Sequence, residues 1–460
     1  MIDIVRIETP ALGDRSYFVT DGQAAFVVDP QRDIDRVLAA AAERGVTITH
    51  VFETHIHNDY VTGGLALAGQ TGAAYFVNAA DQVAFERTPI SDDEVIEVGT
   101  AMRVRAIATP GHTFTHLSYA LEDAATGSVV AVFTGGSLLY GSTGRPDLLG
   151  PDHKAALAAA QHASARRLAA LPDETPVWPT HGFGSFCSAT EASGTASTIG
   201  QEKLTNPVLT LDEDEYVAEL LAGLDAYPAY YAHMGPANSA GPDAADLSEP
   251  APATAAGIAA AIAAGEWVVD LRSRRAFAAG HVPGSLSFEH SNDFTNYLGW
   301  LIPWGTPLTL LGESPEQVAA AQRDLTRIGI DQLAAAASGS AEDWAGDDGL
   351  ATITVASFAD LAAVRHHRPV TVLDVRRDLE WAESHIEDAV HVALHDLPSR
   401  IADLPAGEIW VHCRGGYRAF IATSLLQAAG RTVVAVDDDF TRAAAVGLPL
   451  TSEDTESRAA

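Results

Sequence analysis

The sequence predicts an α/β protein built from three successive domains. Its 460 residues correspond to about three domains of roughly 150 residues each. Short apolar runs typical of strands alternate with helical patterns along most of the chain, which is the order found in α/β folds. An internal repeat supports a duplicated unit, because residues 268–272 read VVDLR and residues 372–376 read VLDVR, roughly one domain length later.

Residues 1–245 form the first predicted domain. Its apolar runs and helical spacings predict strands at 24–29, 49–53, 103–107, 117–121 and 129–134, and helices at 33–44 and 152–170. Residues 239–252 are rich in Pro, Ala and Ser, so we expect a linker there. The acidic end, residues 452–460, is predicted to be a disordered tail.

The two repeated units are predicted at residues 253–346 and 352–451. In the second unit, an apolar strand at 408–411 leads to Cys413, and a helix is expected at 419–429. In the first unit, the matching strand at 307–311 is followed by GESP and no cysteine. The first repeat therefore lacks the thiol that the second repeat offers for chemistry.

Composition excludes several classes of function. The net charge is −33 and the only lysines are Lys154 and Lys203, so nucleic acid and anionic membrane surfaces should repel the chain. No apolar run is long enough for a transmembrane helix, and the first residues lack a signal-peptide pattern. Two distant cysteines do not form a disulfide framework, so we expect a reducing, cytoplasmic location. Association into a homo-oligomer stays open.

Cys413 begins a short loop between the predicted strand and helix. A thiol at such a turn faces free backbone N–H groups and the positive end of the helix dipole, and Arg418 lies close in sequence. We expect these features to stabilise a thiolate and the loop to bind an anionic substrate. The loop residues predicted to bind it are Arg414, Gly415, Gly416 and Tyr417. A buried structural thiol is the alternative.

This loop resembles the active-site loop of rhodanese-type sulfurtransferases. The resemblance extends to residues 372–376, Glu380, residues 385–389 and residues 446–450. Members of this family carry sulfane sulfur as a cysteine persulfide. The resemblance therefore implies that Cys413 is the carrier, assisted by Arg418, with thiosulfate or a low-molecular-weight thiol persulfide as the donor. The first repeat, residues 253–346, resembles an inactive rhodanese, used for packing or for shaping the neighbouring site.

Four histidines and an aspartate follow strand-like runs in the first domain: His55, His57, Asp59, His112 and His181. Loops at strand ends are where α/β folds place their sites. Neutral imidazoles with a carboxylate suit zinc or non-haem iron. We expect these five residues to form a metal site, in which Asp59 is either a ligand or a catalytic base.

The histidine pattern resembles the metallo-β-lactamase superfamily over nearly all of residues 1–245. The resemblance implies an αββα metallo-β-lactamase sandwich, followed here by two α/β rhodanese domains. This combination is similar to persulfide dioxygenase–rhodanese fusions. Those dioxygenases use one iron, held by two histidines and an aspartate, to oxidise a glutathione-type persulfide to sulfite. The two histidines correspond to His55 and His112.

Two positions depart from that family. Tyr60 stands where a histidine usually follows the motif aspartate, and Gly136 stands where an aspartate is usual. Three alternatives follow. The domain is an Fe(II) persulfide dioxygenase, or a zinc hydrolase of thioesters using His55, His57 and His112. In the third, it is a metal-free binding domain, and the last rhodanese unit alone is active.

Several other side chains are weaker candidates. Cys187 lies either near the pocket or in the core, and His116 is expected to be structural or to support a ligand. Arg145 either binds an anionic substrate or forms a surface salt bridge. A substrate cleft or plain packing is expected for four more: Tyr230, Tyr231, His233 and Asn238.

Overall fold

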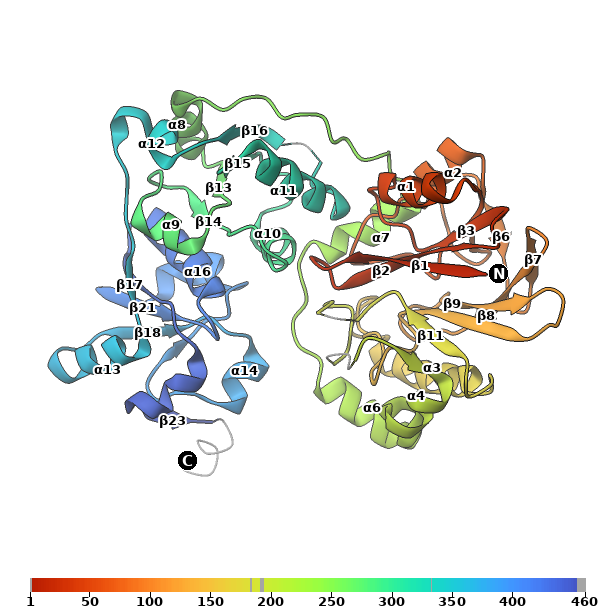
Figure 1. Cartoon of the computed structure of the whole chain (residues 1–460). Helices are drawn as coiled ribbons and strands as arrows, with labels where there is room; N and C mark the ends of the chain where they lie inside the picture. The colour runs from red at the N-terminus through yellow and green to blue at the C-terminus, as the bar shows by residue number, and fades with distance from the viewer. Residues whose placement is uncertain (1, 183, 191–193, 332, 453–460) are drawn as a thin grey trace. The chain divides into compact units, whose positions relative to one another are not determined.

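The computed structural model describes residues 2–182, 184–190, 194–331 and 333–452 (Figure 1). The chain divides into two compact units. The first unit comprises residues 1–246 and 324–329, and the second comprises residues 247–323 and 330–460. Apart from Ser452, the predicted tail at 452–460 lies outside the described residues.

The first unit contains two six-stranded sheets. The strands of the first sheet lie side by side in chain order. Strands β1 to β3 pair antiparallel, and β3 to β6 pair parallel. These strands are β1 (Asp3–Thr9), β2 (Asp14–Thr20), β3 (Ala24–Val28), β4 (Thr47–Phe52), β5 (Ala74–Asn78) and β6 (Thr88–Ile90).

The second sheet is ordered β12-β11-β10-β9-β8-β7. It is antiparallel except for the parallel pair β10 and β11. Its strands are β7 (Val95–Val98), β8 (Met102–Ala108), β9 (Leu117–Asp123), β10 (Val129–Gly135), β11 (Pro176–Pro179) and β12 (Ser197–Thr198).

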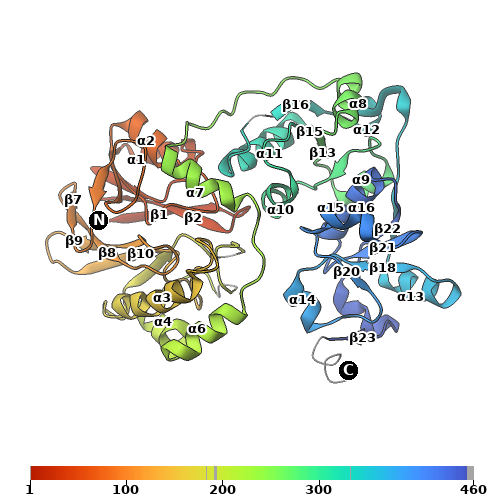
Figure 2. The same ribbon diagram turned by 180° about the vertical axis from the view of Figure 1, so that it is seen from behind.

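The two sheets pack face to face through a shared apolar core. Phe26 of the first sheet meets Phe133 of the second edge-on at 6.0 Å between ring centroids, and Phe52 meets Tyr119 at 5.1 Å. Helices cover both outer faces (Figure 2). Helices α1 (Asp35–Arg44) and α2 (Gly64–Thr71) pack on the first sheet. The second sheet is covered by α3 (Lys154–Leu168), α4 (Ile199–Thr205), α5 (Pro207–Thr210) and α6 (Glu213–Ala222), and α7 (Tyr231–Ala240) closes the unit.

This αββα order places the ends of four strands at the candidate site. The loop after β4 carries His55 and His57, and the loop after β8 carries His112. Gly136 follows β10, and His181 follows β11. The predicted strands at 24–29, 49–53, 103–107, 117–121 and 129–134 are confirmed, as are the predicted helices at 33–44 and 152–170.

The second unit contains two parallel sheets. The first is ordered β14-β13-β15-β16. Its strands are β13 (Trp267–Asp270), β14 (Leu286–Ser287), β15 (Leu308–Gly312) and β16 (Leu333–Ser338). The helices around it are α8 (Ala255–Ala263), α9 (Arg274–Ala279), α10 (Phe294–Leu301), α11 (Pro315–Arg327) and α12 (Ala341–Ala345), followed by the 3₁₀ turn η1 (Gly346–Asp348).

The second parallel sheet is ordered β17-β22-β21-β18-β20. Its strands are β17 (Thr354–Ala356), β18 (Thr371–Asp374), β20 (Val390–His391), β21 (Glu408–His412) and β22 (Thr432–Val436). A separate antiparallel pair joins β19 (His385–Ile386) to β23 (Leu450–Thr451). The helices are α13 (Phe358–His367), α14 (Asp378–Glu383), α15 (Leu397–Arg400) and α16 (Tyr417–Ala428), with 3₁₀ turns η2 (Ile401–Asp403), η3 (Phe440–Arg442) and η4 (Ala444–Val446).

The repeated sequence motif makes the same contacts in both sheets. Arg272 pairs with Asp270 at 2.6 Å, and Arg376 pairs with Asp374 at 2.7 Å. Each arginine also donates to a backbone carbonyl eight residues further along the chain. These matching contacts, with the matching strand order, support the duplication inferred from sequence. The assignment of both copies as rhodanese domains stays a proposal.

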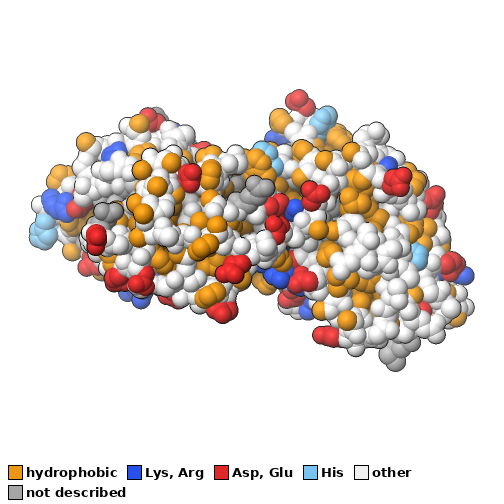
Figure 3. Space-filling view, turned by 90° about the horizontal axis from the view of Figure 1, so that it is seen from above, with side chains coloured by type: hydrophobic (Ala, Val, Ile, Leu, Met, Phe, Trp, Pro, Cys, Tyr) orange, Lys and Arg blue, Asp and Glu red, His pale blue; other side chains and the backbone are white. Residues whose placement is uncertain are grey.

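The surface carries many acidic side chains, as the net charge of −33 requires. Acidic side chains are scattered over the visible face rather than gathered in one patch (Figure 3). Among the described residues, no helix combines the length and the apolar character needed to cross a bilayer.

Candidate functional site

Four histidine rings gather at the strand ends of the first unit. All four side chains are buried. Their ring centroids lie 4.1 Å apart for His55 and His57, 4.8 Å for His55 and His112, and 5.3 Å for His112 and His181. The fold thus brings together residues from three separate loops, as the spacing of the motifs predicts.

Each of these rings has one nitrogen bound to the protein. The four anchoring contacts are His55 Nδ1 to Thr54 Oγ1 at 2.9 Å, His57 Nε2 to the Tyr60 hydroxyl at 2.9 Å, His112 Nδ1 to the Arg145 carbonyl at 2.8 Å, and His181 Nδ1 to Asp14 Oδ1 at 3.0 Å. Metal-binding histidines are typically anchored in this way through the nitrogen that does not bind the metal.

The other ring nitrogens point into the buried site without an ordinary partner. Nδ1 of His57 and Nε2 of His112 have no hydrogen-bond partner among the described residues. Nε2 of His55 and Nε2 of His181 face each other at 3.4 Å. Two nitrogen ligands on a tetrahedral metal with bonds of about 2.0–2.1 Å lie roughly 3.4 Å apart. Because buried polar atoms are normally paired, these open nitrogens fit a metal ion.

Asp59 lies beside the rings rather than at their centre. Its Oδ2 is 3.1 Å from His181 Nδ1, and its Oδ1 is 4.0 Å from His57 Nδ1. Burial alone would lower the pKa of His181, but the carboxylates of Asp59 and Asp14 raise it well above its usual value. Burial and the charge of Asp59 raise the pKa of Asp14 to about 7. Burial would raise the pKa of Asp59, but the charge and hydrogen bond of His181 outweigh it and lower that pKa. Asp59 is therefore an ionised partner that orients His181.

An acidic pair on the far side of His57 was missed by the sequence analysis. His57 Nε2 lies 3.3 Å from Asp29 Oδ1 and 3.4 Å from Glu53 Oε2. Burial would lower the pKa of His57, but Asp29 and Glu53 outweigh it and raise that pKa to about 9. The available signal was that each carboxylate directly follows an apolar strand. Asp14, the first residue of β2, offered no comparable signal.

Tyr60 and Gly136, which depart from the family pattern, each contact a histidine of the site or its support. The Tyr60 hydroxyl anchors His57, so Tyr60 supports a ring rather than offering itself to a metal. A Cβ atom at Gly136 would lie 2.3 Å from His112 Cδ2, so the His112 ring fills the space of a side chain there. The Gly136 N–H donates to His116 Nε2 at 3.0 Å, and His116 Nδ1 contacts Thr109. With both nitrogens engaged, His116 fits the structural alternative.

Two of the weaker candidates turn out to brace the site. The side-chain amide of Asn238 donates to the carbonyls of His57 and Tyr60, both at 2.8 Å. Arg145 is buried and forms a two-pronged pair with Asp147 at 2.7 and 2.8 Å. Its guanidinium also lies 4.6 Å from the centroid of the Tyr227 ring. The charge of Arg145 is therefore satisfied inside the protein.

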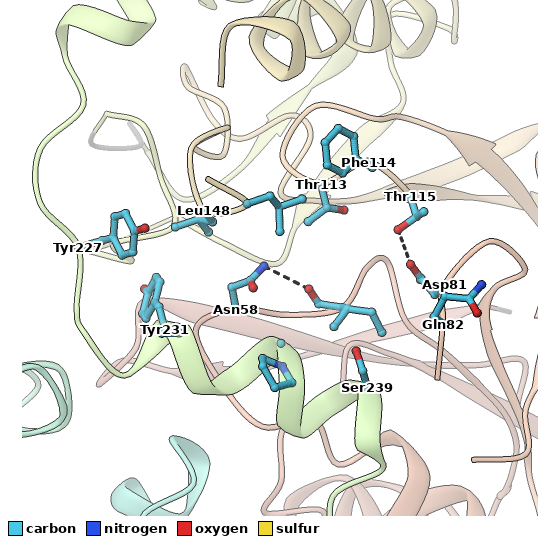
Figure 4. Close-up of a pocket in the computed structure, with 15 residues that line it drawn as sticks. Asn58, Asp81, Gln82, Thr113, Phe114, Thr115, Leu148, Tyr227, Tyr231 and Ser239 are labelled. Atoms are coloured by element: carbon cyan, nitrogen blue, oxygen red, sulfur yellow. Dashed lines mark hydrogen bonds between the residues drawn. The ribbon is translucent and has the colours of Figure 1, made fainter. Parts of the chain in front are cut away.

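A pocket of about 580 Å³ adjoins the histidine loops (Figure 4). Ile56 and Asn58 come from the loop of His55 and His57, and Thr113 follows His112. Tyr231 of α7 forms part of the wall, whereas Tyr230, His233 and Asn238 are not among the lining residues identified. The volume suits a small-molecule ligand. Among the described lining residues there is no Lys or Arg, and Asp81 is the only one with an ionisable carboxyl group.

Cys413 is buried in the second unit, directly after β21. The backbone N–H of Gly416 donates to its Sγ at 3.1 Å. Gly416 adopts a φ of +96°, which favours glycine, and α16 begins at the next residue. The predicted strand, loop and helix are thus in place, and the helix starts two residues before the predicted one.

Arg418, at the start of α16, is held by the carboxylate of Glu380. Its Nη1 and Nη2 contact Glu380 Oε2 and Oε1 at 2.5 and 2.8 Å. Burial would raise the pKa of Glu380, but the hydrogen bonds and charge of Arg418 outweigh it and lower that pKa to about 2. Arg418 therefore stays charged and ordered beside Cys413. Arg414 is exposed.

The repeat without a cysteine packs against the Cys413 loop. The Tyr417 hydroxyl donates to the carbonyl of Glu289 at 3.1 Å, and its ring lies 5.9 Å from that of Tyr297. Arg274 pairs with Asp437 at 2.9 Å. Local sequence patterns do not encode these contacts, because they join residues far apart in the chain.

Two family models each match one segment of the chain. Residues 11–181 match the model of the metallo-beta-lactamase superfamily, and residues 357–444 match that of the rhodanese-like domain. Over 184 residues the chain is 31% identical to a hydroxyacylglutathione hydrolase of Synechococcus sp.. This match covers 38% of this chain and 67% of that relative. The chain belongs to the metallo-β-lactamase superfamily. A rhodanese domain follows the metallo-β-lactamase fold.

Relatives of this metallo-β-lactamase domain bear two kinds of name. A hydroxyacylglutathione hydrolase of Polaromonas sp. is 31% identical over 162 residues, covering 35% of this chain. This match spans only 57% of that relative's length. Human mitochondrial persulfide dioxygenase ETHE1 is 28% identical over 211 residues, covering 45% of this chain and 74% of that enzyme. The metallo-β-lactamase and rhodanese families are enzymatic.

A solved structure extends the similarity beyond the metallo-β-lactamase domain. The crystal structure of a metallo-beta-lactamase from Staphylococcus aureus is 28% identical, with a TM-score of 0.66. The match covers 73% of this chain and 98% of that one. It therefore includes more than the first unit.

Proposed function

We propose that this protein processes sulfane sulfur at two sites. The metallo-β-lactamase domain holds one metal ion, Fe(II) or Zn(II), and acts on a low-molecular-weight thiol persulfide. The rhodanese domain carries sulfur as a persulfide of Cys413, taken from thiosulfate or a thiol persulfide. The two activities share a substrate class, which gives a reason for their fusion in one chain.

The observation that supports the metal site is that each histidine ring contacts the protein through one nitrogen and turns the other toward the site. His55, His57, His112 and His181 each contact the protein through one nitrogen. The second nitrogens of His57 and His112 have no hydrogen-bond partner among the described residues, and those of His55 and His181 face each other at 3.4 Å. When bound, Fe(II) would supply the redox chemistry for oxidation of a persulfide by O₂ to sulfite. The adjoining pocket would hold the thiol portion, and the ionised Asp59 would orient His181.

The chemistry at Cys413 needs no metal. The thiolate attacks the outer sulfur of the donor, forming a new S–S bond while the donor's S–S bond breaks. The electron pair of the broken bond leaves with sulfite from thiosulfate, or with the thiolate of a thiol persulfide. The Gly416 N–H donates to Sγ at 3.1 Å, and Arg418 supplies positive charge for the anionic donor.

The test follows sulfite production and oxygen uptake with glutathione persulfide and iron-loaded protein. Wild type should consume oxygen and release sulfite, and His112→Gln should lose this activity while keeping its far-UV circular dichroism. Separately, Cys413→Ser should fail to gain one sulfur atom from thiosulfate by mass spectrometry. Absence of sulfite from iron-loaded wild type would refute the dioxygenase, and sulfur loading of Cys413→Ser would refute the carrier.

A second candidate is a zinc thioesterase. The relatives named hydroxyacylglutathione hydrolase favour it, as does a donor set rich in histidine. A zinc-bound water gives a hydroxide near neutral pH, which suits thioester hydrolysis. Zinc in the purified protein, with thioester cleavage that is lost in His55→Ala, would support hydrolysis over oxidation.

A further inference from the structure

The space that a carboxylate at position 136 would need is closed. The His112 ring is enclosed by two glycines, because a Cβ at Gly136 would lie 2.3 Å from its Cδ2 and a Cβ at Gly144 would lie 2.7 Å from its Nδ1. No side chain larger than hydrogen fits at position 136 without moving this ring. The carboxylate donor usual in the family is therefore missing from this position.

Cys187 lies next to the histidine cluster. The Sγ atom and one ring nitrogen each of His112 and His181 all lie within 4.8 Å of one another, and all three residues are buried. Among the described residues, only one other cysteine is present, Cys413, and it belongs to the second unit. Cys187 is thus a soft donor in the wall of a histidine-rich site.

One residue's backbone holds Cys187 and His112 together. The Arg145 carbonyl contacts His112 Nδ1 at 2.8 Å, and the Arg145 N–H donates to the Cys187 carbonyl at 2.8 Å. The guanidinium of Arg145 is in turn fixed by Asp147 at 2.7 Å. This arrangement keeps the two side chains on adjacent, mutually braced loops.

His112 provides an independent indication that a cation belongs there. A carbonyl oxygen can only accept, so His112 Nδ1 carries the proton and Nε2 presents a lone pair. That Nε2 is buried and has no hydrogen-bond partner in the described part of the chain. An open lone pair beside a thiol, with a second histidine nearby, is a typical arrangement of zinc and iron ligands.

We propose that Cys187 is a ligand of the metal ion, together with His112 and His181, and replaces the carboxylate that Gly136 cannot supply. The inference rests on the proposed function, because it requires that a metal occupy this site. Binding of the divalent ion displaces the thiol proton to solvent, with no change of oxidation state. A thiolate among imidazoles favours Zn(II) or Fe(II) over harder ions such as Mg(II).

The test uses the full-length protein loaded with cobalt in place of the native metal. A cobalt–thiolate bond gives a charge-transfer band in the near ultraviolet. We expect the band in wild type and in Cys413→Ser, which removes the other cysteine, and its loss in Cys187→Ser. Removing a residue that merely orients a ligand lowers metal affinity roughly 10- to 100-fold. Cys187→Ser should therefore lower zinc affinity at least about tenfold.

X-ray absorption on zinc-loaded Cys413→Ser gives a result that does not depend on the folding of Cys187→Ser. The spectrum, recorded without thiol reductants, should show one sulfur neighbour at about 2.3 Å. Cobalt or zinc bound with nitrogen and oxygen neighbours alone would overturn the role of Cys187 and leave the metal site standing. Failure of wild type to bind either metal would overturn both this inference and the proposed metal chemistry.

Discussion

Tyr60 shows how a single residue can replace a lost metal ligand without becoming one. Its buried hydroxyl contacts His57 Nε2 at 2.9 Å, on the side of the ring away from the open Nδ1. The same ring nitrogen faces Asp29 at 3.3 Å. Tyr60 therefore sets the orientation of His57, and its contribution should appear in metal affinity.

Tyr60→Phe should weaken metal binding while leaving the fold intact. Without the hydroxyl, His57 loses one of the contacts that fix its ring, and such losses lower metal affinity roughly 10- to 100-fold. Competition with a chelator measures the zinc affinity. Tyr216→Phe is a matched control, since the hydroxyl of this buried tyrosine contacts Thr143 at 2.9 Å. Equal zinc affinity of the Tyr60→Phe variant and wild type would contradict the role given to Tyr60.

Glu380→Gln should remove a pH-dependent part of stability. The folded-state pKa of Glu380 is about 2, below its ordinary value of 4.5. A depressed pKa means that the ion pair stabilises the protein above about pH 4.5, and that this stabilisation is lost as the pH falls toward 2. We expect Glu380→Gln to lower the free energy of unfolding by about 1–3 kcal/mol near pH 7.

Denaturant unfolding of wild type and Glu380→Gln across this pH range measures the difference. It should shrink as the solution is acidified. Asp403→Asn removes an exposed pair with Arg400 and should change stability by less than about 1 kcal/mol. A difference between wild type and Glu380→Gln that grows on acidification would show that Glu380 is not paired as described.

The individual residues of the sites were only partly predictable. His55, His112 and Cys413 follow apolar strands, and residues at strand ends meet at one edge of a fold. The anchors of the rings were not predictable to the same extent. The Arg145 carbonyl reaches His112 across 33 positions of sequence, and Asp14 reaches His181 across 167. Such contacts depend on how distant loops pack, and local patterns do not encode that.

At the scale of the element, the start of α16 decides the geometry at Cys413. The helix begins at Tyr417, directly after a glycine with a positive φ. This turn directs the Gly416 N–H at the sulfur, and no carbonyl of the helix competes for that donor. The apolar run predicted β21 and the helical pattern predicted α16. Packing of α10 beside Tyr417 followed from neither, because it comes from the other repeat.

Gly416→Ala should impair the loop, whereas Gly415→Ala should be tolerated. A Cβ at position 416 would lie 2.4 Å from Asp437 Oδ1, on a backbone with φ of +96°. A Cβ at position 415 would meet no described residue within 4 Å other than its chain neighbours. Strain of this kind costs roughly 1–3 kcal/mol. Sulfur loading from thiosulfate and thermal unfolding should both suffer in Gly416→Ala, and equal behaviour of the two variants would contradict this account.

At the scale of the whole molecule, charge should govern which substrates enter easily. The net charge is −33, and among the described residues that line the pocket there is no Lys or Arg. A negative field lowers the local concentration of anions and slows their association. Salt screens such fields over roughly 10 Å at about 0.1 M ionic strength.

Turnover of an anionic persulfide should therefore rise with salt. For glutathione persulfide, we expect kcat/KM to increase roughly 2- to 10-fold as ionic strength rises from about 20 mM to about 200 mM. The persulfide of glutathione diethyl ester, which lacks both carboxylates, is the matched control and should respond much less. A fall in kcat/KM of the anionic substrate with salt would point to attraction, and would contradict a repulsive field at the pocket.

The four histidine rings of the first unit come from three loops, and we propose that they surround one metal ion. Elemental analysis of the protein purified without added metal and without oxygen tests it most directly. We expect about one iron or zinc per chain in wild type and in Cys413→Ser, and a clear loss in His112→Gln. Wild-type protein that contains no transition metal, and takes up none on addition of Fe(II) or Zn(II), would contradict it.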